Sequence, residues 1–178
     1  MDQSGNGVPQ DYAESVKWSR KAAERGHAPA QNALAFRYAS GQGVKKDYYE
    51  AVRWFRRSAN QGYDEAYNNL GWHYANGFGV PLDFAEAAKW RRRAAELGHL
   101  GSLADLGNMY SAGKGVEQDY VQAYAFLLLA QEQQAPTAME ALRLLLPKLT
   151  PEQAAEAHRR AGDFKATHPD AEWLQKLE

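Results

Sequence analysis

GFGVPLD, residues 77–83, is one of four near-copies of a single heptapeptide in this 178-residue chain. The others are GNGVPQD at 5–11, GQGVKKD at 41–47 and GKGVEQD at 113–119, so each copy begins 36 residues after the last. The same interval separates other residues, including an aromatic column formed by Trp18, Trp54, Trp90 and Phe126. A regular internal period of this length predicts one structural unit repeated in tandem.

The aspartate of each copy predicts the start of a helix. Asp47 is followed three residues later by Glu50, the pattern of a capping box, which recurs at Asp11/Glu14, Asp83/Glu86 and Asp119/Gln122. The apolar face of this helix is predicted at three- and four-residue spacing, with Tyr48, Ala51, Val52, Phe55 and Ala59. Gly62 predicts a left-handed residue at its end.

Another helix is predicted from about Asp64 to Asn76, burying Ala66, Leu70 and Tyr74 at four-residue spacing. Glycines 77 and 79 permit the positive φ of a tight turn into the next unit. The unit is therefore a helix hairpin. The Asp64–Asn76 helix comes first in its unit and is here called the leading helix, and the helix that begins at the aspartate is called the second helix. A single hairpin cannot bury its apolar face, so stacked copies are expected to form a curved solenoid.

On these residues the chain resembles the Sel1-like repeat family, a relative of the tetratricopeptide repeat. The third copy carries the pattern as Ala66, Leu70, Gly71, Tyr74, Gly77, Gly79, Val80, Asp83, Ala87, Trp90, Ala94, Ala95 and Gly98. The resemblance covers roughly residues 5–134 and implies an all-α, right-handed α–α superhelix. We expect one domain over 1–178, with a partial unit at about 5–27, full units at 28–63, 64–99 and 100–135, and helical C-terminal capping at 136–178.

Both ends depart from the pattern. The first copy lacks its leading helix, which leaves the face of the helix after Asp11 uncovered; this indicates a trimmed chain or a homodimer surface. After Gln134 the period stops, and 136–149 predicts an apolar helix in place of a fifth leading helix. Thr150, Pro151 and Gln153 predict the start of a closing helix, and the last eleven residues predict a short helix or a tail.

The composition argues against several classes of function. Lys and Arg total 21 and Asp and Glu total 22, so no net charge attracts the chain to nucleic acid or membranes. The chain has no cysteine, which excludes disulfides and thiolate metal sites. We see neither a signal peptide nor a membrane span, and we expect a soluble protein of the cytoplasm or periplasm.

No motif indicates chemistry. His27 and His99 share a linker column, and His158 and His168 lie in the cap without metal-ligand spacing. The recurrent carboxylates act as caps, and the loop glycines lack the fingerprint of a nucleotide site. We therefore expect no enzyme activity, no cofactor and no metal.

The leading helices line the concave side in related repeats. The positions that the repeat leaves free there are the candidate partner-binding residues: Asn32, Phe36, Arg37, Asn68, Trp72, His73, Asn76 and Asn108. Phe36 and Trp72 share a column and are expected side by side on the groove, unless they pack between adjacent hairpins. Neighbouring asparagines would hydrogen-bond an extended peptide, and Arg37 and His73 are expected to be partly buried.

The resemblance implies a non-catalytic scaffold that binds a protein or peptide partner, as in bacterial members of the family. One alternative is binding of RNA or an acidic partner by a basic ridge on the second helices, although a solvated convex face is the default interpretation of these residues: Lys17, Arg20, Lys21, Arg53, Arg56, Arg57, Lys89, Arg91, Arg92 and Arg93. RNA readers need a code on corresponding positions of successive units, which is not seen here. The other alternative is a regulatory subunit of an enzyme.

Overall fold

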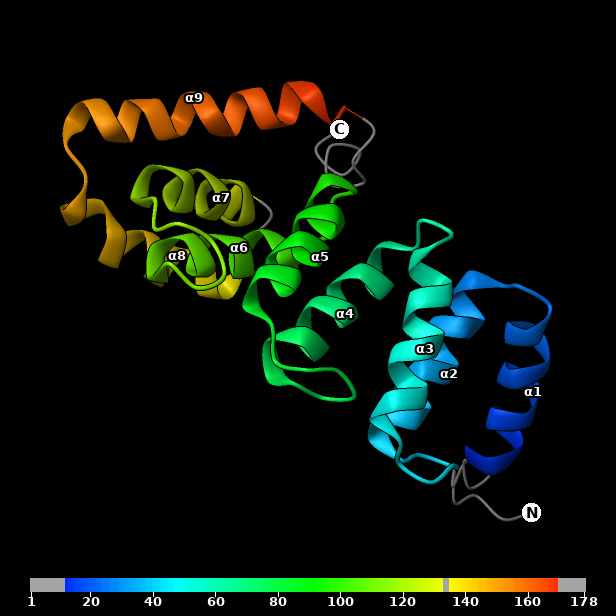
Figure 1. Ribbon diagram of the computed structural model, residues 1–178. Helices are drawn as coiled ribbons and strands as arrows, with labels where there is room; N and C mark the ends of the chain where they lie inside the picture. Colours follow the sequence, from blue (N-terminus) through cyan, green and yellow to red (C-terminus); the bar gives the residue numbers. More distant parts are fainter. Residues whose placement is uncertain (1–11, 133–134, 170–178) are drawn as a thin grey trace, which may run out of the picture.

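A computed structural model describes residues 12–132 and 135–169, and within these ranges it contains helices and no strand (Figure 1). The expected all-α class is confirmed. The elements are α1 (Tyr12–Glu24), α2 (Ala28–Ser40), α3 (Tyr48–Ala59), α4 (Asp64–Asn76), α5 (Phe84–Glu96), α6 (Leu100–Ala112), α7 (Tyr120–Glu132), α8 (Pro136–Leu145), the 3-10 helix η1 (Leu146–Lys148) and α9 (Pro151–Thr167).

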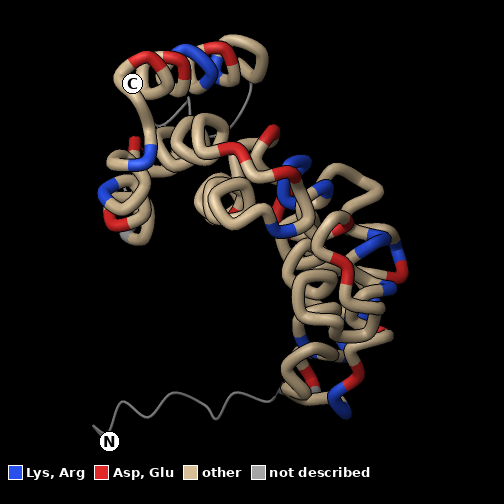
Figure 2. The backbone as a smooth tube through the Cα atoms, turned by 60° about the vertical axis from the view of Figure 1, so that its left-hand side comes forward, with Lys and Arg blue, Asp and Glu red and all other residues tan. Residues whose placement is uncertain are grey.

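The helices pack as consecutive hairpins, α2 with α3, α4 with α5, and α6 with α7, and each hairpin packs on the next. Figure 2 shows that the hairpins follow one another along an arc, as a superhelical solenoid requires. The predicted solenoid is confirmed. None of the described helices combines the length and apolar character needed to cross a lipid bilayer.

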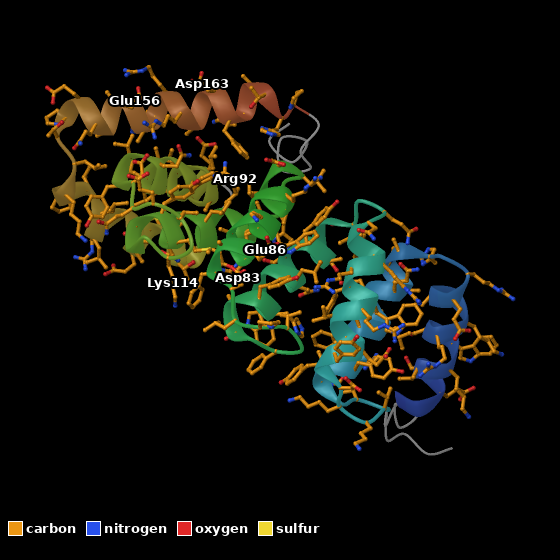
Figure 3. All side chains as sticks on the ribbon, in the orientation of Figure 1. Asp83, Glu86, Arg92, Lys114, Glu156 and Asp163 are labelled. Atoms are coloured by element: carbon orange, nitrogen blue, oxygen red, sulfur yellow. The ribbon has the colours of Figure 1, made fainter. Side chains whose placement is uncertain are left out.

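The helix caps follow the predicted aspartates, with one difference. The carboxylates of Asp47, Asp83 and Asp119 accept hydrogen bonds from the backbone three residues on, at 3.0, 2.9 and 2.9 Å. In a capping box the glutamate side chain also accepts a hydrogen bond from the backbone amide of the aspartate. This second bond is absent from the starts of α3 and α5, where the aspartate amide donates to a tyrosine carbonyl. Glu86, which lies close to Asp83 at the start of α5 (Figure 3), accepts from Lys89 instead, and the amide of Asp83 donates to the carbonyl of Tyr74. A tertiary contact thus satisfies the donor that a capping box would have used. Asp11 lies outside the described residues.

The second glycine of the loop allows close contact between neighbouring units. Gly77 ends α4 in the left-handed region at φ 68°, and Gly79 follows at φ 74°. A Cβ atom on Gly79 would overlap the carbonyl of Tyr48, at the first turn of α3. The loop after α4 therefore lies directly against the second helix of the preceding unit, and only glycine permits that approach.

A tyrosine–arginine hydrogen bond recurs between successive units. Arg20 donates to the hydroxyl of Tyr38 at 2.7 Å and Arg56 to that of Tyr74 at 2.6 Å. Arg92 bonds to Tyr110 in the same way and extends toward α7, where its guanidinium lies 5.9 Å from the ring of Phe126 (Figure 3). One arginine of each predicted basic cluster therefore belongs to the contact between units.

The helices that follow α7 pack against it. Helix α8 and η1 take the place of a fifth leading helix, whereas α9 packs on α7. Thr150 and Gln153 form the predicted capping box at the start of α9. Arg160 of α9 donates to the carboxylate of Asp119 at 2.9 Å. Burial raises the pKa of Asp119, but hydrogen bonds from the Gln122 amide and from Arg160 outweigh it and hold the pKa below its ordinary value. The final segment, 170–178, lies outside the described residues.

The first helix presents a face that later units bury. Trp18 of α1 is 64% exposed, whereas Trp54, one period later, is 6% exposed. The side chain of Trp54 lies in the core with Phe55 and Leu34, which are almost fully buried. The expected uncovered face of the first helix is therefore present among the described residues.

Candidate functional site

A pocket of about 330 Å³ opens between α2 and α4. It is lined by Phe36, Ala39, Ser40, Tyr48, Phe55, Asn68, Asn69, Trp72, His73 and Asp105. Phe36 and Trp72 are 54% and 43% exposed, so both aromatic side chains line the pocket while keeping much of their surface open to solvent. The pocket combines aromatic walls with a few polar groups, which is typical of a binding site.

His73 contributes a neutral ring to the pocket. Its Nδ1 lies 2.7 Å from the carbonyl oxygen of Phe78, to which the protonated nitrogen donates. Burial lowers the pKa of His73, and the hydrogen bond to Phe78 opposes this only in part. The rings of Tyr48, Phe55 and Trp72 surround the imidazole at centroid distances of 5.7, 5.3 and 5.1 Å. The histidine therefore extends the apolar surface of the pocket at neutral pH.

Two asparagine amides give the pocket a donor and an acceptor. Asn69 donates to Asn32 at 3.0 Å, and Asn32 in turn donates to Glu65 at 3.1 Å. The Asn68 carbonyl oxygen accepts from Ser102 at 3.0 Å. Among the hydrogen bonds of the described residues, none uses Asn68 Nδ2 or Asn69 Oδ1. These bonds fix the two amides, and the remaining donor and acceptor are the kinds of group that pair with the carbonyl and N–H of a peptide group.

The structure brings together half of the predicted site residues. Phe36, Asn68, Trp72 and His73 all line the pocket. His73 is only 2% exposed, so it is more deeply buried than predicted and serves as part of the wall.

The other four predicted residues lie elsewhere. Asn32 is buried behind Asn69. Near the end of α2, Arg37 bonds to Gln42 at 2.7 Å, and Asn76 donates to the Trp72 carbonyl at 2.8 Å at the end of α4. Asn108 lines a different pocket, between α6 and α8.

Sequence reasoning missed several residues of the pocket. Asn69 and Asp105 share a column with Ala33, and the variation in that column was the available signal that the fold leaves it free. Tyr48 and Phe55 were assigned to the apolar face of the second helix, where they also lie, but they reach past the leading helices to the pocket.

The predicted basic ridge was wrong in including Arg91. Its side chain is 12% exposed, and it pairs with Asp105 of α6 at 3.1 Å. A Cβ atom on Gly71 of α4 would meet its Cγ, so the side chain lies between α4 and α6. It occupies the column that holds Phe55 and Leu127 in the neighbouring units. Arg91 is therefore an inward-facing residue and contributes little charge to the outer surface. Within the described residues, no three His, Asp or Glu side chains converge to hold a metal ion.

Comparison with known proteins places these features in a family. The Sel1 repeat matches residues 3–27, 28–63, 64–99 and 101–133. A Sel1 repeat protein from Oxalobacter formigenes is 36% identical, with a TM-score of 0.71 over 78% of this chain and 57% of that one. The protective antigen c5321 of uropathogenic Escherichia coli, which displays an SLR fold, is 30% identical, with a TM-score of 0.67 over 98% of this chain and 45% of that one.

Helicobacter pylori cysteine rich protein B shares the fold at 22% identity, with a TM-score of 0.59 over 77% of this chain and 98% of that one. The chain spans only about half the length of the first two proteins. No curated protein matches it. Sel1 repeat proteins are generally scaffolds for protein–protein interaction. Because the repeat model matches well over half of its residues, the chain belongs to the Sel1 repeat family.

Proposed function

We propose that this chain is a non-catalytic scaffold that binds an extended peptide segment of a partner protein in the groove formed by α2, α4 and α6. The exposed pair of Phe36 and Trp72 over an apolar pocket carries this proposal. Exposed aromatic side chains beside a pocket are typical anchors of protein interfaces. A regulatory subunit that binds an enzyme would use the same groove.

The shape and polarity of the pocket favour a peptide. A volume of about 330 Å³ lies at the low end of the range for ligand sites, which suits one large side chain. Asn68 and Asn69 present a donor and an acceptor beside the pocket, the two kinds of group that a backbone amide needs as partners. A partner segment would insert an apolar side chain and align its backbone with the two amides.

The test is a Phe36→Ala/Trp72→Ala double variant. Peptides selected from a random library displayed on phage would be synthesised with a fluorophore, and their affinity measured by anisotropy. We expect a loss of at least about tenfold, because each anchor contributes on the order of 1–2 kcal/mol. Tyr49→Ala is the control, since Tyr49 is 66% exposed and does not line the pocket. Unchanged affinity in a double variant of normal stability would refute the proposal.

Nucleic acid is not the partner in this proposal. Arg20, Arg56 and Arg92 are held by tyrosines between the units, and Arg91 is turned inward. The tyrosine bonds fix three guanidinium groups at the contacts between units, and Asp105 neutralises Arg91, so fewer side chains are free to follow a phosphate backbone. Filter binding with mixed RNA at several salt concentrations should show no salt-dependent retention. Retention that falls steeply with salt would favour the ridge instead.

Self-association is a further part of the proposal. The exposed Trp18 on α1 is the surface through which two copies would pair. Sedimentation velocity across concentrations tests this. Dimers that disappear in Trp18→Ser would support the proposal, and a wild-type chain that stays monomeric at high concentration would contradict it.

A further inference from the structure

The groove contains a second pocket that is the repeat equivalent of the first. It lies between α6 and α8, has a volume of about 220 Å³, and is lined by Asn108, Ser111, Leu127, Ala141, Leu144, Leu145 and Lys148. Residues two periods of 36 apart occupy equivalent positions, so Asn108 corresponds to Phe36, Leu127 to Phe55, Leu144 to Trp72 and Leu145 to His73. The fold therefore builds the same cavity twice, over the same position of a second helix.

The two pockets differ in chemistry. Aromatic rings form most of the first, whereas leucine and alanine side chains form the apolar part of the second. Leu144 is 62% exposed, like its counterpart Trp72. The charged residue at the first pocket is Asp105, and at the second it is Lys148. Asp105 is paired with Arg91, whereas Lys148 has no ion-pair partner among the described residues, so a ligand would meet an unpaired positive charge at the second pocket.

Between the pockets, the equivalent place is occupied by a charged pair. Arg91 stands where Phe55 and Leu127 stand in the flanking units, and its guanidinium reaches Asp105 at 3.1 Å and the sulfur of Met109 at 3.4 Å. The side chain lies between α4 and α6, where an apolar anchor would otherwise insert. A ligand crossing this part of the groove meets polar groups and not an apolar cavity.

From this arrangement we infer that the partner segment is held by two apolar anchors, an aromatic side chain in the α2–α4 pocket and an aliphatic side chain in the α6–α8 pocket. The inference rests on the proposed function. The Arg91–Asp105 pair separates the two anchors. An acidic residue is expected beside the aliphatic anchor, because it would complement Lys148.

The repeat sets the separation of the anchors. Directly packed helices lie about 8–10 Å apart, and the leading helices of successive units are separated by at least that distance, so two units place the pockets at least on the order of 20 Å from each other. An extended chain rises about 3.3 Å per residue, so about six residues span that distance. A ligand helix of the same reach would need about thirteen residues at 1.5 Å each and would leave the amides of Asn68 and Asn69 without backbone partners.

The experiment uses the full chain and a library of random 16-residue peptides displayed on phage. Enriched peptides should share an aromatic and an aliphatic residue at one fixed separation near six. Synthetic versions should lose affinity about tenfold or more with Phe36→Ala/Trp72→Ala, and about tenfold with Leu144→Ser. Leu82→Ser is the matched control, since Leu82 is an equally exposed leucine outside both pockets.

A double-mutant cycle assigns each anchor to its pocket. A peptide without its aromatic residue should no longer respond to Phe36→Ala/Trp72→Ala, yet should still respond to Leu144→Ser. Affinity that falls with the aromatic double variant but not with Leu144→Ser would overturn the two-anchor inference and leave the proposed function standing. Affinity that falls with neither variant would overturn both.

Discussion

Gly79 shows how one residue can join two units of the solenoid. Its positive φ alone would disfavour any other residue by about 1–2 kcal/mol. The overlap of a methyl group with the Tyr48 carbonyl adds a second cost, which overpacking studies place at about 1–3 kcal/mol. The two costs can be separated because the chain holds another positive-φ glycine in open space.

We predict that Gly79→Ala lowers the free energy of unfolding by about 2–5 kcal/mol, and Gly62→Ala by only about 1–2 kcal/mol. Gly62 has φ 85°, but a Cβ atom added there would meet nothing within 4 Å, so this position reports the backbone term alone. Urea unfolding of both variants measures the difference. Equal losses would show that the loop does not depend on its contact with α3.

His73 makes the stability of the fold dependent on pH. Because burial lowers its pKa in the folded state, the unfolded chain binds the proton first as the pH falls below about 6.5. The stabilising contribution is therefore complete above that value and is lost as the pH falls toward the folded-state pKa. His73→Asn keeps a donor for the Phe78 carbonyl but cannot ionise.

We expect the stability difference between wild type and His73→Asn to shrink between pH 7.5 and 5. Urea unfolding at several pH values measures this difference. The contributions of the other histidines to the free energy of unfolding cancel because both proteins contain them. Curves that stay parallel over the whole range would mean that His73 titrates equally in both states.

Among the helices, α9 packs on α7 through apolar side chains and a few polar bonds. Arg160 donates to Asp119 and, at 3.2 Å, to Gln122, so it attaches α9 to the capped end of α7. Its neighbour Arg159 pairs only with Glu156 of the same helix among the described residues. The two arginines form a natural comparison between a contact across helices and a contact within one.

Arg160→Met should cost about 1 kcal/mol, since the pair is more than one-third exposed and solvent weakens it. Arg159→Met should cost less than about 0.5 kcal/mol. Hydrogen exchange should rise in α9 only for the first variant. Below the folded-state pKa of Asp119 the bond is lost, so the two variants should converge in acid.

Helix positions were predictable from the sequence, while cap partners were only partly so. The predicted bounds of α4 agree with Asp64–Asn76, because apolar spacing and the flanking glycines are local signals. The capping-box return bond was wrong at Glu86, whose carboxylate pairs with Lys89. His99 was assigned to a linker, yet its Nδ1 caps α6 through the Ser102 amide at 3.2 Å. Such choices depend on competing partners that a local pattern does not contain.

Across the solenoid, equivalent residues have unequal importance according to their place in the stack. We predict that Trp54→Ala costs about 3–5 kcal/mol, as expected for a buried tryptophan, whereas Trp18→Ala costs less than about 0.5 kcal/mol. Thermal or urea unfolding of the two variants tests this. The small value for Trp18→Ala applies at protein concentrations where the chain is monomeric, and a large loss there would mean that another segment covers α1. A loss that appears only at higher concentration would reflect the proposed pairing of two copies.

The candidate site was predicted in outline. The exposed column of Phe36 and Trp72 follows from the repeat, because subtracting the fixed positions leaves it free. The inward turn of Arg91 and the contribution of Asp105 could not be predicted, since they depend on the angle between successive hairpins. A column shows which face of a helix a residue shares, but it does not show how close the next leading helix lies.

The arginine–tyrosine bonds have a consequence for how such a chain can change in length. Each joins residues 18 positions apart, across the boundary of two duplicated units. Excising 36 consecutive residues therefore rejoins an arginine to a tyrosine at the same separation, and each loop meets a helix start of the same kind. Insertions or losses in whole multiples of the period therefore preserve these arginine–tyrosine contacts between units. Each unit gained or lost between the two cavities changes their separation by the length of one unit.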